Sequence, residues 1–167
     1  MIEIESVAEL RKQLNSKGSF PIKSSPGVYR WWFPKNEAEK LLKKFKSPMQ
    51  HSGRILQAWN IDGTPYYAIY FGMSSNLRRR IRWHICGPFK KSTLRRTLRA
   101  LVAPNEVDKL IDSCFLEWQY TSDLKMAKAR EKVELISQTI FAYPLNIKEN
   151  RTMSREWVIE LKDKRKI

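Results

Sequence analysis

The chain has 167 residues, of which 42% are hydrophobic and 11% aromatic, and it carries 32 Lys and Arg against 17 Asp and Glu. This length favours one domain, and the apolar fraction is large enough for a buried core, which excludes a disordered or fibrous chain. The formal net charge of +15 favours a polyanionic partner, with nucleic acid as the leading class. Charge alone separates neither an enzyme from a binding protein nor DNA from RNA.

Cysteine usage and hydropathy limit the cellular compartment in which the protein is expected to act. Cys86 and Cys114 are too far apart for a paired metal-ligand motif, and one pair does not make a disulfide framework. No apolar run reaches the roughly 20 residues that cross a bilayer. The first residues, MIEIESVAEL, are acidic where a signal peptide is basic. We expect a soluble, cytoplasmic protein without a membrane partner.

Hydrophobic spacing and turn residues predict the elements along the chain. They are a helix over residues 3–18, a strand over 27–33, a helix over 36–46, strands over 55–61 and 66–71, a helix after residue 76, a helix over 90–102, a short helix over 105–113, a strand over 114–121, a helix from about 124 to 142 and a basic C-terminal helix over 152–166.

The stretch from residue 66 to residue 84 joins a strand directly to a helix. Residues 66–71 form an unbroken β-branched and aromatic run that stops at Gly72, and Asn76 is a good helix N-cap. In the helix that follows, Arg80 and His84 are four residues apart and share one flank beside the apolar stripe. Taken alone, this is an amphipathic helix with solvated arginines.

A run of basic residues surrounds this helix. No Asp or Glu occurs between Gly63 and Asn105, although solvated faces normally mix both signs. The run therefore predicts a phosphate-binding surface, and Trp83 and Phe89 within it could stack on bases. The predicted nucleic-acid-binding residues are Arg78, Arg79, Arg82, Lys90, Lys91, Arg95, Arg96 and Arg99.

The helix over residues 124–142 combines an apolar stripe with carboxylates. Asp123 is its expected cap, and Glu131 and Glu134 form a line beside the stripe, where a carboxylate could face a cleft. The residues expected to face the core are Met126, Ala129, Val133, Ile136 and Ile140.

Four elements in a fixed order resemble the GIY-YIG nuclease family. They are the triplets Gly27-Val28-Tyr29 and Tyr70-Phe71-Gly72, an arginine ten residues after the second tyrosine at Arg80, and a glutamate helix followed by Pro144 and Asn146. The order matters more than the triplets, which are common. The resemblance spans residues 27–146 and implies an α+β fold with a small central, mostly antiparallel, three-stranded sheet flanked by helices.

The resemblance also implies roles. Tyr29 would act as the general base or position the attacking water, Arg80 would clamp the scissile phosphate, and Glu134 would hold one Mg²⁺ or Mn²⁺ ion. Tyr70 and His84 would assist through hydrogen bonds. A phenol is a poor base at neutral pH, so neighbouring positive charge must favour its phenolate. The matched structural residues are Gly27, Gly72 and Asn146.

The sequence departs from the family pattern in places. Val28 and Phe71 replace isoleucines, and the insert over residues 34–62 is longer than the family minimum. Pro144 lies one residue further from the glutamate than in the excision-repair members. Glu131, one turn earlier on the same face, is therefore the alternative metal ligand to Glu134.

Three functions are compatible with these residues. The leading one is a metal-dependent endonuclease that hydrolyses DNA, most simply double-stranded DNA. The alternatives are a non-catalytic basic nucleic-acid-binding module that keeps the fold, and an RNA-associated structural protein. We expect one domain over residues 1–167 with its core at 27–146. No separate DNA-recognition domain is visible, so the additions to the core or formation of a homodimer would supply any specificity.

Overall fold

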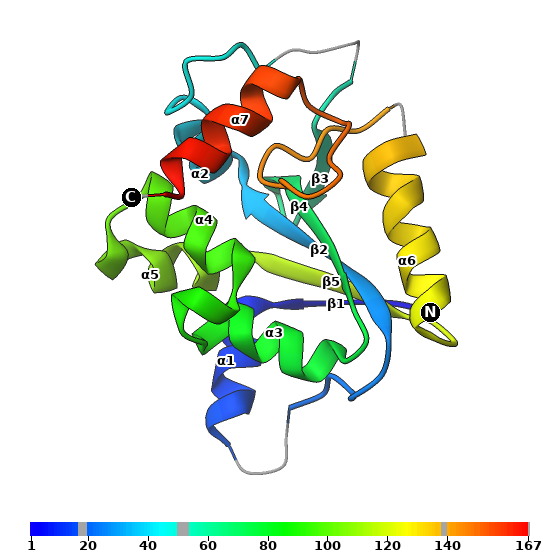
Figure 1. The fold of residues 1–167 in the computed structure, drawn as a ribbon. Coiled ribbons are helices and arrows are strands. Elements are labelled where there is room, and N and C mark those ends of the chain that lie inside the picture. Colours follow the sequence, from blue (N-terminus) through cyan, green and yellow to red (C-terminus); the bar gives the residue numbers. More distant parts are fainter. Residues whose placement is uncertain (17–19, 50–53, 138–139, 167) are drawn as a thin grey trace.

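The computed structural model describes residues 1–16, 20–49, 54–137 and 140–166. These residues form one antiparallel sheet flanked by helices (Figure 1). The strands are β1 (Ile2–Ser6), β2 (Gly27–Pro34), β3 (Gln57–Ile61), β4 (Thr64–Ser74) and β5 (Phe115–Tyr120). The helices are α1 (Val7–Asn15), α2 (Lys35–Leu42), α3 (Leu77–Cys86), α4 (Thr93–Leu101), α5 (Val107–Asp112), α6 (Leu124–Lys132) and α7 (Arg155–Lys164), with 3₁₀ turns at Phe89–Lys91 and Pro104–Glu106 and a π-helical turn at Val133–Ser137.

The sheet confirms the expected fold class but has five strands, in the order β1-β5-β2-β4-β3, where the family resemblance implied three. One of the two others, β3, corresponds to the strand predicted over residues 55–61. The other, β1, replaces the beginning of the helix predicted over residues 3–18. Residues 2–6 alternate isoleucine with glutamate, which is a strand pattern, and they pair with β5. Ser6 ends the strand and caps α1 by accepting the backbone N–H of Glu9 at 3.2 Å. The end predicted at Gly18 lies outside the described residues.

Strand β2 lies between β4 and β5, and its two faces enter different apolar clusters. Trp31 and Phe33 join the larger cluster, which α1 to α5 and α7 cover. Val28 and Trp32 point to the other face and join a smaller cluster. Helix α6 lies on that side of the sheet (Figure 1), where its Ala127 joins this cluster together with Leu135 and Tyr143 from the segment that follows it.

Helix α6 differs from the sequence prediction in length and in its buried face. It begins at the expected cap, where Asp123 Oδ1 accepts the N–H of Met126 at 2.7 Å. Met126 is nevertheless 49% exposed and Val133 52% exposed, so the predicted apolar stripe is wrong. Ala127 and Leu135 pack on the sheet instead. A short helix that covers one small apolar patch needs few buried side chains, and spacing alone did not show which they are.

The strand-to-helix junction confirms the prediction. Strand β4 extends to Ser74, and Asn76 caps α3 by accepting the N–H of Arg79 at 3.0 Å. Helix α3 then runs beneath the sheet with Ile81 and Ile85 fully buried. None of the helices in the described parts of the chain is long and apolar enough to cross a membrane.

Candidate active site

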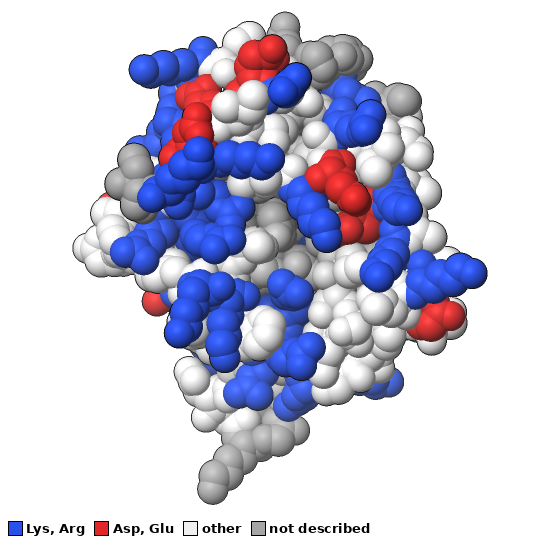
Figure 2. Space-filling model, viewed as in Figure 1, with Lys and Arg blue, Asp and Glu red and all other residues white. Residues whose placement is uncertain are grey.

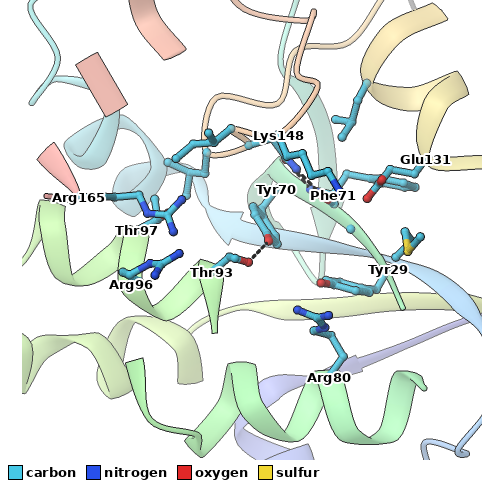
Figure 3. A pocket seen from close by; sticks show the side chains of 16 residues that line it. Tyr29, Tyr70, Phe71, Arg80, Thr93, Arg96, Thr97, Glu131, Lys148 and Arg165 are labelled. Atoms are coloured by element: carbon cyan, nitrogen blue, oxygen red, sulfur yellow. Dashed lines mark hydrogen bonds between the residues drawn. The ribbon is translucent and has the colours of Figure 1, made fainter. Parts of the chain in front are cut away.

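A cavity of about 530 Å³ opens beside the second half of β4. Strand β3 pairs with β4 only as far as Ala68, so the following residues of β4 form a sheet edge. Side chains from β2, β4, α3, α4 and α6, and from the segments after α6 and α7, reach this cavity (Figure 3). Its polar lining comprises Tyr29, Tyr70, Arg80, Thr93, Arg96, Thr97, Glu131, Asn146, Lys148 and Arg165.

The register of β2 and β4 brings the two motif tyrosines together. Tyr29 is paired with Gly72 and Trp31 with Tyr70, so both phenols lie on the same face, with ring centroids 6.4 Å apart. The ring of Tyr29 crosses β4 directly over Gly72, where a Cβ atom would overlap its phenolic oxygen. Gly72 is therefore the residue that lets Tyr29 reach the cavity.

Gly27, the other motif glycine, has a packing role. A Cβ atom there would overlap the carbonyl oxygen of Gln119 on β5 and the side chain of Leu77 on α3. The missing side chain therefore lets β2, β5 and α3 approach closely at the start of the motif.

Tyr29 is the first group in a buried chain of hydrogen bonds. Its hydroxyl lies 2.7 Å from Nε2 of His84, whose Nδ1 lies 2.7 Å from Oγ of Ser92. Ser92 is also the N-cap of α4, since its Oγ accepts the N–H of Arg95 at 3.0 Å. His84 is fully buried. The chain fixes the imidazole ring between the phenol and the start of α4.

The surroundings of these hydrogen-bonded groups keep both Tyr29 and His84 in their neutral forms. Burial raises the pKa of Tyr29 well above its usual value; nearby Tyr70 adds to this rise, and Arg80 only partly offsets it. Burial, followed by the charges of Arg80 and Arg95, lowers the pKa of His84 to about 3. At neutral pH the phenol is therefore protonated and the imidazole is neutral. Positive charge from Arg80 does favour the phenolate, as expected, but burial is the larger effect and outweighs it.

Tyr70 lies at the middle of the cavity and is anchored separately. Its hydroxyl lies 2.7 Å from Oγ1 of Thr93 at the first turn of α4. Burial raises the pKa of Tyr70 as well, so it is a neutral hydrogen-bonding group at pH 7. In Figure 3 it separates Tyr29 and Arg80 from Arg96 and Arg165.

Arg80 points from α3 towards the two tyrosines (Figure 3). Burial raises the pKa of Tyr29, Tyr70 and Glu131, and the positive charge of Arg80 opposes each of these rises, so its field reaches all three groups. Its Nε is buried and has no hydrogen-bond partner among the described residues, and its guanidinium lies 5.8 Å from the centre of the Trp83 ring. The guanidinium is therefore held by packing and is free to bind an anion.

The two candidate carboxylates lie in different places. Glu131 lines the cavity and faces Tyr29 (Figure 3). Glu134 does not line the cavity; it is buried against Arg30, which donates to Oε1 at 3.4 Å, and Tyr143, which donates to Oε2 at 2.8 Å. Burial raises the pKa of Glu131, whereas Lys148 and Arg80 oppose the rise. The structure thus brings Tyr29, Arg80 and Glu131 together and leaves Glu134 outside this group.

The cavity suits a divalent cation that binds through one protein carboxylate, that of Glu131, rather than through several protein ligands. No group of three or more His, Cys, Asp or Glu side chains suited to a metal occurs in the described part of the chain. Mg²⁺ commonly binds through one or two carboxylates and completes its shell with water and substrate phosphate. The single carboxylate of Glu131 in a water-accessible cavity is compatible with this mode.

Asn146 closes the exposed edge of β4. Its side-chain amide accepts the N–H of Phe71 at 2.9 Å and donates to the carbonyl oxygen of Phe71 at 2.6 Å. The amide therefore replaces a neighbouring strand, and it holds the chain after α6 against the cavity.

The basic residues predicted to bind phosphate separate into two groups. Arg78 donates to the carbonyl oxygens of Phe20 and Ile22, at 3.0 and 3.1 Å. Arg95 is 6% exposed and donates to Asp108 at 2.7 Å. Both guanidinium groups are used inside the protein, so we leave these two residues out of the phosphate-binding surface. The exposed ones are Arg79, Arg82, Lys90, Lys91, Arg96 and Arg99.

The exposed cations form a continuous surface next to the cavity. Figure 2 shows Lys and Arg gathered over α3 and α4 on the face that carries the site. Trp83 lies among them, half-buried, with Arg79 at 5.3 Å and Lys91 at 5.5 Å from its ring centre. Cations around one indole, with carboxylates absent from this stretch of sequence, make a surface suited to phosphates and bases.

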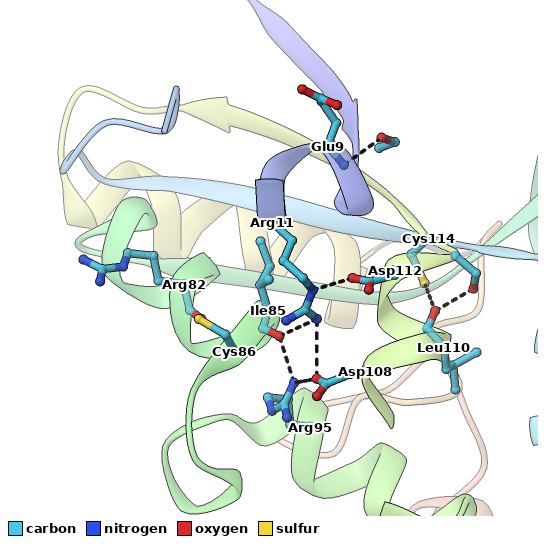
Figure 4. Close-up of polar contacts among 12 residues, drawn as sticks. Glu9, Arg11, Arg82, Ile85, Cys86, Arg95, Asp108, Leu110, Asp112 and Cys114 are labelled. Carbon is cyan, nitrogen blue, oxygen red and sulfur yellow. Dashed lines mark hydrogen bonds and ion pairs between the residues drawn. The ribbon is translucent and has the colours of Figure 1, made fainter. Parts of the chain in front are cut away.

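The C-terminal end of α3 is fixed by a polar cluster (Figure 4). Arg11 of α1 and Arg95 of α4 each donate to the carbonyl oxygen of Ile85 at 2.9 Å. Asp112 accepts from Arg11 at 2.6 Å, and Asp108 accepts from both arginines. The helix that carries Arg80 and His84 is thereby tied to α1, α4 and α5.

Comparison with profiles of protein families matches residues 27–167 to the GIY-YIG catalytic domain. The chain belongs to the GIY-YIG catalytic domain family. The suspected resemblance is therefore confirmed, over a range that extends beyond residue 146 to the end of the chain. Comparison with curated proteins and with solved structures returned no match.

In this GIY-YIG domain, the sequence did not single out Ser92, which lies behind His84, or three residues that line the cavity, Thr93, Lys148 and Arg165. Ser92 and Thr93 carried a weak signal, because a Ser-Thr pair before an apolar periodic run is a typical helix start. Lys148 and Arg165 carried none, since each is one cation among many. They reach the cavity only because the segment after α6 and the end of α7 fold back beside β4 and α4.

Proposed function

We propose that this GIY-YIG domain is a metal-dependent endonuclease that hydrolyses phosphodiester bonds of DNA. The observation that carries the proposal is the convergence of Tyr29, Arg80 and Glu131 in one cavity, from three separate elements. Nuclease activity is what membership of the family implies, and the net charge of +15 suits a nucleic-acid substrate.

The residues divide the chemistry among them. Arg80 binds two oxygens of the scissile phosphate through its planar guanidinium and offsets the charge that develops on phosphorus. Glu131 would hold one Mg²⁺ or Mn²⁺ ion, which would supply further positive charge at the phosphate when bound. The water oxygen forms the new bond to phosphorus, the bond to the leaving sugar oxygen breaks, and that oxygen takes up a proton from solvent water.

Tyr29 orients the water. In the proposed arrangement its hydroxyl donates to Nε2 of His84, and Nδ1–H of His84 donates to Ser92, so the lone pairs of the phenol face the cavity and accept a hydrogen bond from the water. Because burial disfavours a free phenolate, the proton of the water reaches Tyr29 only as its own proton passes to His84. Burial is the main cause of the low pKa of His84, so the imidazole takes this proton only in concert with attack by the water; phosphate bound at Arg80 offsets the next cause, the charge of that arginine.

The test is cleavage of supercoiled plasmid with Mg²⁺ or Mn²⁺. We expect the wild type to nick or linearise the plasmid, and we expect Tyr29→Phe, Arg80→Gln and Glu131→Gln to lose at least about a hundredfold in rate. Arg155→Gln, an exposed arginine at the start of α7, is the control for loss of one charge. A wild type that cuts no faster than the three variants with any metal contradicts the proposal; salt-sensitive binding without cleavage then supports the binding-module alternative.

A further inference from the structure

The cavity has a second cationic end that the proposed chemistry does not use. Arg96 on α4 and Arg165, directly after α7, line it together with the hydroxyl groups of Thr93 and Thr97. In Figure 3 the two guanidinium groups lie near each other on the side of Tyr70 away from Tyr29. The cavity therefore has two basic ends, with Tyr70 between them.

These two arginines lack a counter-charge. Neither forms an ion pair or a hydrogen bond with a carboxylate in the described part of the chain, and Nε of Arg165 is buried without a partner there. Burial, followed by the charge of Arg96, lowers the pKa of Arg165. By contrast, the adjacent Arg95 is paired with Asp108. Two guanidinium groups held together without a carboxylate repel each other, and a bound anion removes that cost.

The carboxylates close to Arg165 in the sequence are engaged elsewhere. Glu160 accepts the backbone N–H groups of Lys46 and Ser47, at 2.7 and 2.9 Å. Asp163 pairs with Lys166 at 2.9 Å. At the end of α7, Arg165 therefore reaches the cavity without a nearby carboxylate to neutralise its charge.

We propose that Arg96 and Arg165 bind a second phosphate of the cleaved strand, next to the scissile phosphate at Arg80. The inference rests on the proposed nuclease function and defines its substrate as a polynucleotide strand that spans both ends of the cavity. Arginine suits this task because its fork of N–H groups matches phosphate oxygens. Tyr70 lies between the two phosphates; burial raises its pKa, and the charges of both Arg80 and Arg165 oppose that rise, so both ends of the cavity act on it.

The test is a scan of single phosphates. Products of wild-type cleavage first locate the scissile bond in a short duplex. The affinity of the Tyr29→Phe variant is then measured for duplexes in which one phosphate at a time is replaced by a neutral methylphosphonate. We expect weakened binding at the scissile position and at one adjacent position of the same strand. In Tyr29→Phe with Arg96→Gln and Arg165→Gln, affinity for the unmodified duplex falls about tenfold or more, and only the adjacent position loses its sensitivity.

A matched control removes two charges outside the cavity. Arg155→Gln with Lys162→Gln changes two exposed residues of α7, and we expect it to keep both sensitive positions. If the variant that lacks both Arg96 and Arg165 does not fold, Tyr29→Phe with Arg165→Gln alone replaces it, because Arg165 lies after the last turn of α7. Sensitivity at the scissile position alone, or an adjacent sensitivity that survives loss of both arginines, overturns the subsite and leaves the nuclease function standing. A wild type that does not cleave overturns both.

Discussion

Glu131 and Glu134 are three residues apart near the end of α6, yet one faces the cavity and the other is enclosed by Arg30 and Tyr143. In a regular α-helix, residues three apart are neighbours on one flank. Here the π-helical turn Val133–Ser137 begins between them. This turn joins α6 to the segment that closes the cavity, and it separates a carboxylate available for chemistry from one used for stability.

The two glutamates therefore predict opposite mutant phenotypes. Glu131→Gln is expected to abolish plasmid cleavage without lowering the thermal unfolding midpoint, because its carboxylate forms no ion pair among the described residues. Glu134→Gln is expected to lower the free energy of unfolding by about 1–3 kcal/mol and to keep cleavage at low temperature, because Arg30 retains its bond to Glu117 at 2.9 Å. Thermal unfolding and cleavage rates, measured on the same preparations, check both. The reverse pattern would make Glu134 the metal ligand.

Gly72 predicts a specific steric coupling to Tyr29. Gly72→Ala places a methyl group against the phenolic oxygen, so we expect a loss of about 1–3 kcal/mol in the free energy of unfolding and a strong loss of cleavage. The methyl group overlaps the ring carbons of Tyr29 as well as its oxygen, so adding Tyr29→Ala, which removes the whole ring, should recover part of that stability but not the activity. Urea unfolding of the two single variants and the double variant gives the coupling energy. Strictly additive effects would show that the ring does not lie over Gly72.

His84 predicts a pH-dependent contribution to stability. Its pKa is about 3 in the folded protein, against an ordinary value near 6.5 in the unfolded chain. Between these values the unfolded state binds a proton that the folded state does not, so stability rises with pH across this window. The contribution is complete above about pH 6.5 and is lost as the pH falls towards 3, by at most about 1.4 kcal/mol per pH unit.

The measurement is the free energy of unfolding of wild type and of His84→Gln at pH 7.5 and pH 5. We expect the wild type to lose more stability than the variant on acidification. The other histidine, His51, is present in both proteins and cancels in the difference. Equal losses would mean that His84 is accessible to protons in the folded state.

The contacts of Arg11 lead us to predict that α1 stabilises α3, the helix that carries Arg80 and His84. Arg11→Met removes one of the two donors to the carbonyl oxygen of Ile85 and the ion pair with Asp112, so we expect a loss of about 1–3 kcal/mol in the free energy of unfolding. Lys12→Met, an exposed neighbour on the same helix, is the control and should change stability little. Urea unfolding of the two variants checks this. Equal effects would show that the cluster in Figure 4 is not a support for α3.

Local patterns predicted much of this fold because they depend on near neighbours. The run before Gly72 and the cap at Asn76 specify a strand that passes into a helix, and the structure has both. Order and spacing were enough to identify the GIY-YIG family, since the tyrosine and arginine motifs each lie within one local segment. The predicted helix includes residues 3–6, because their strand character is realised only by pairing with β5, more than 100 residues later.

The sequence by itself determined the family, the strand that carries Tyr29 and the helix that carries Arg80 and His84, because short-range spacing encodes those elements. Only the tertiary structure decided which glutamate faces the cavity, that Arg78 and Arg95 are used inside the protein, and that Arg165 joins Arg96 beside Tyr70. These distinctions depend on contacts between segments distant in sequence, and on burial, which sets whether a charged side chain is paired, neutral or free to bind phosphate.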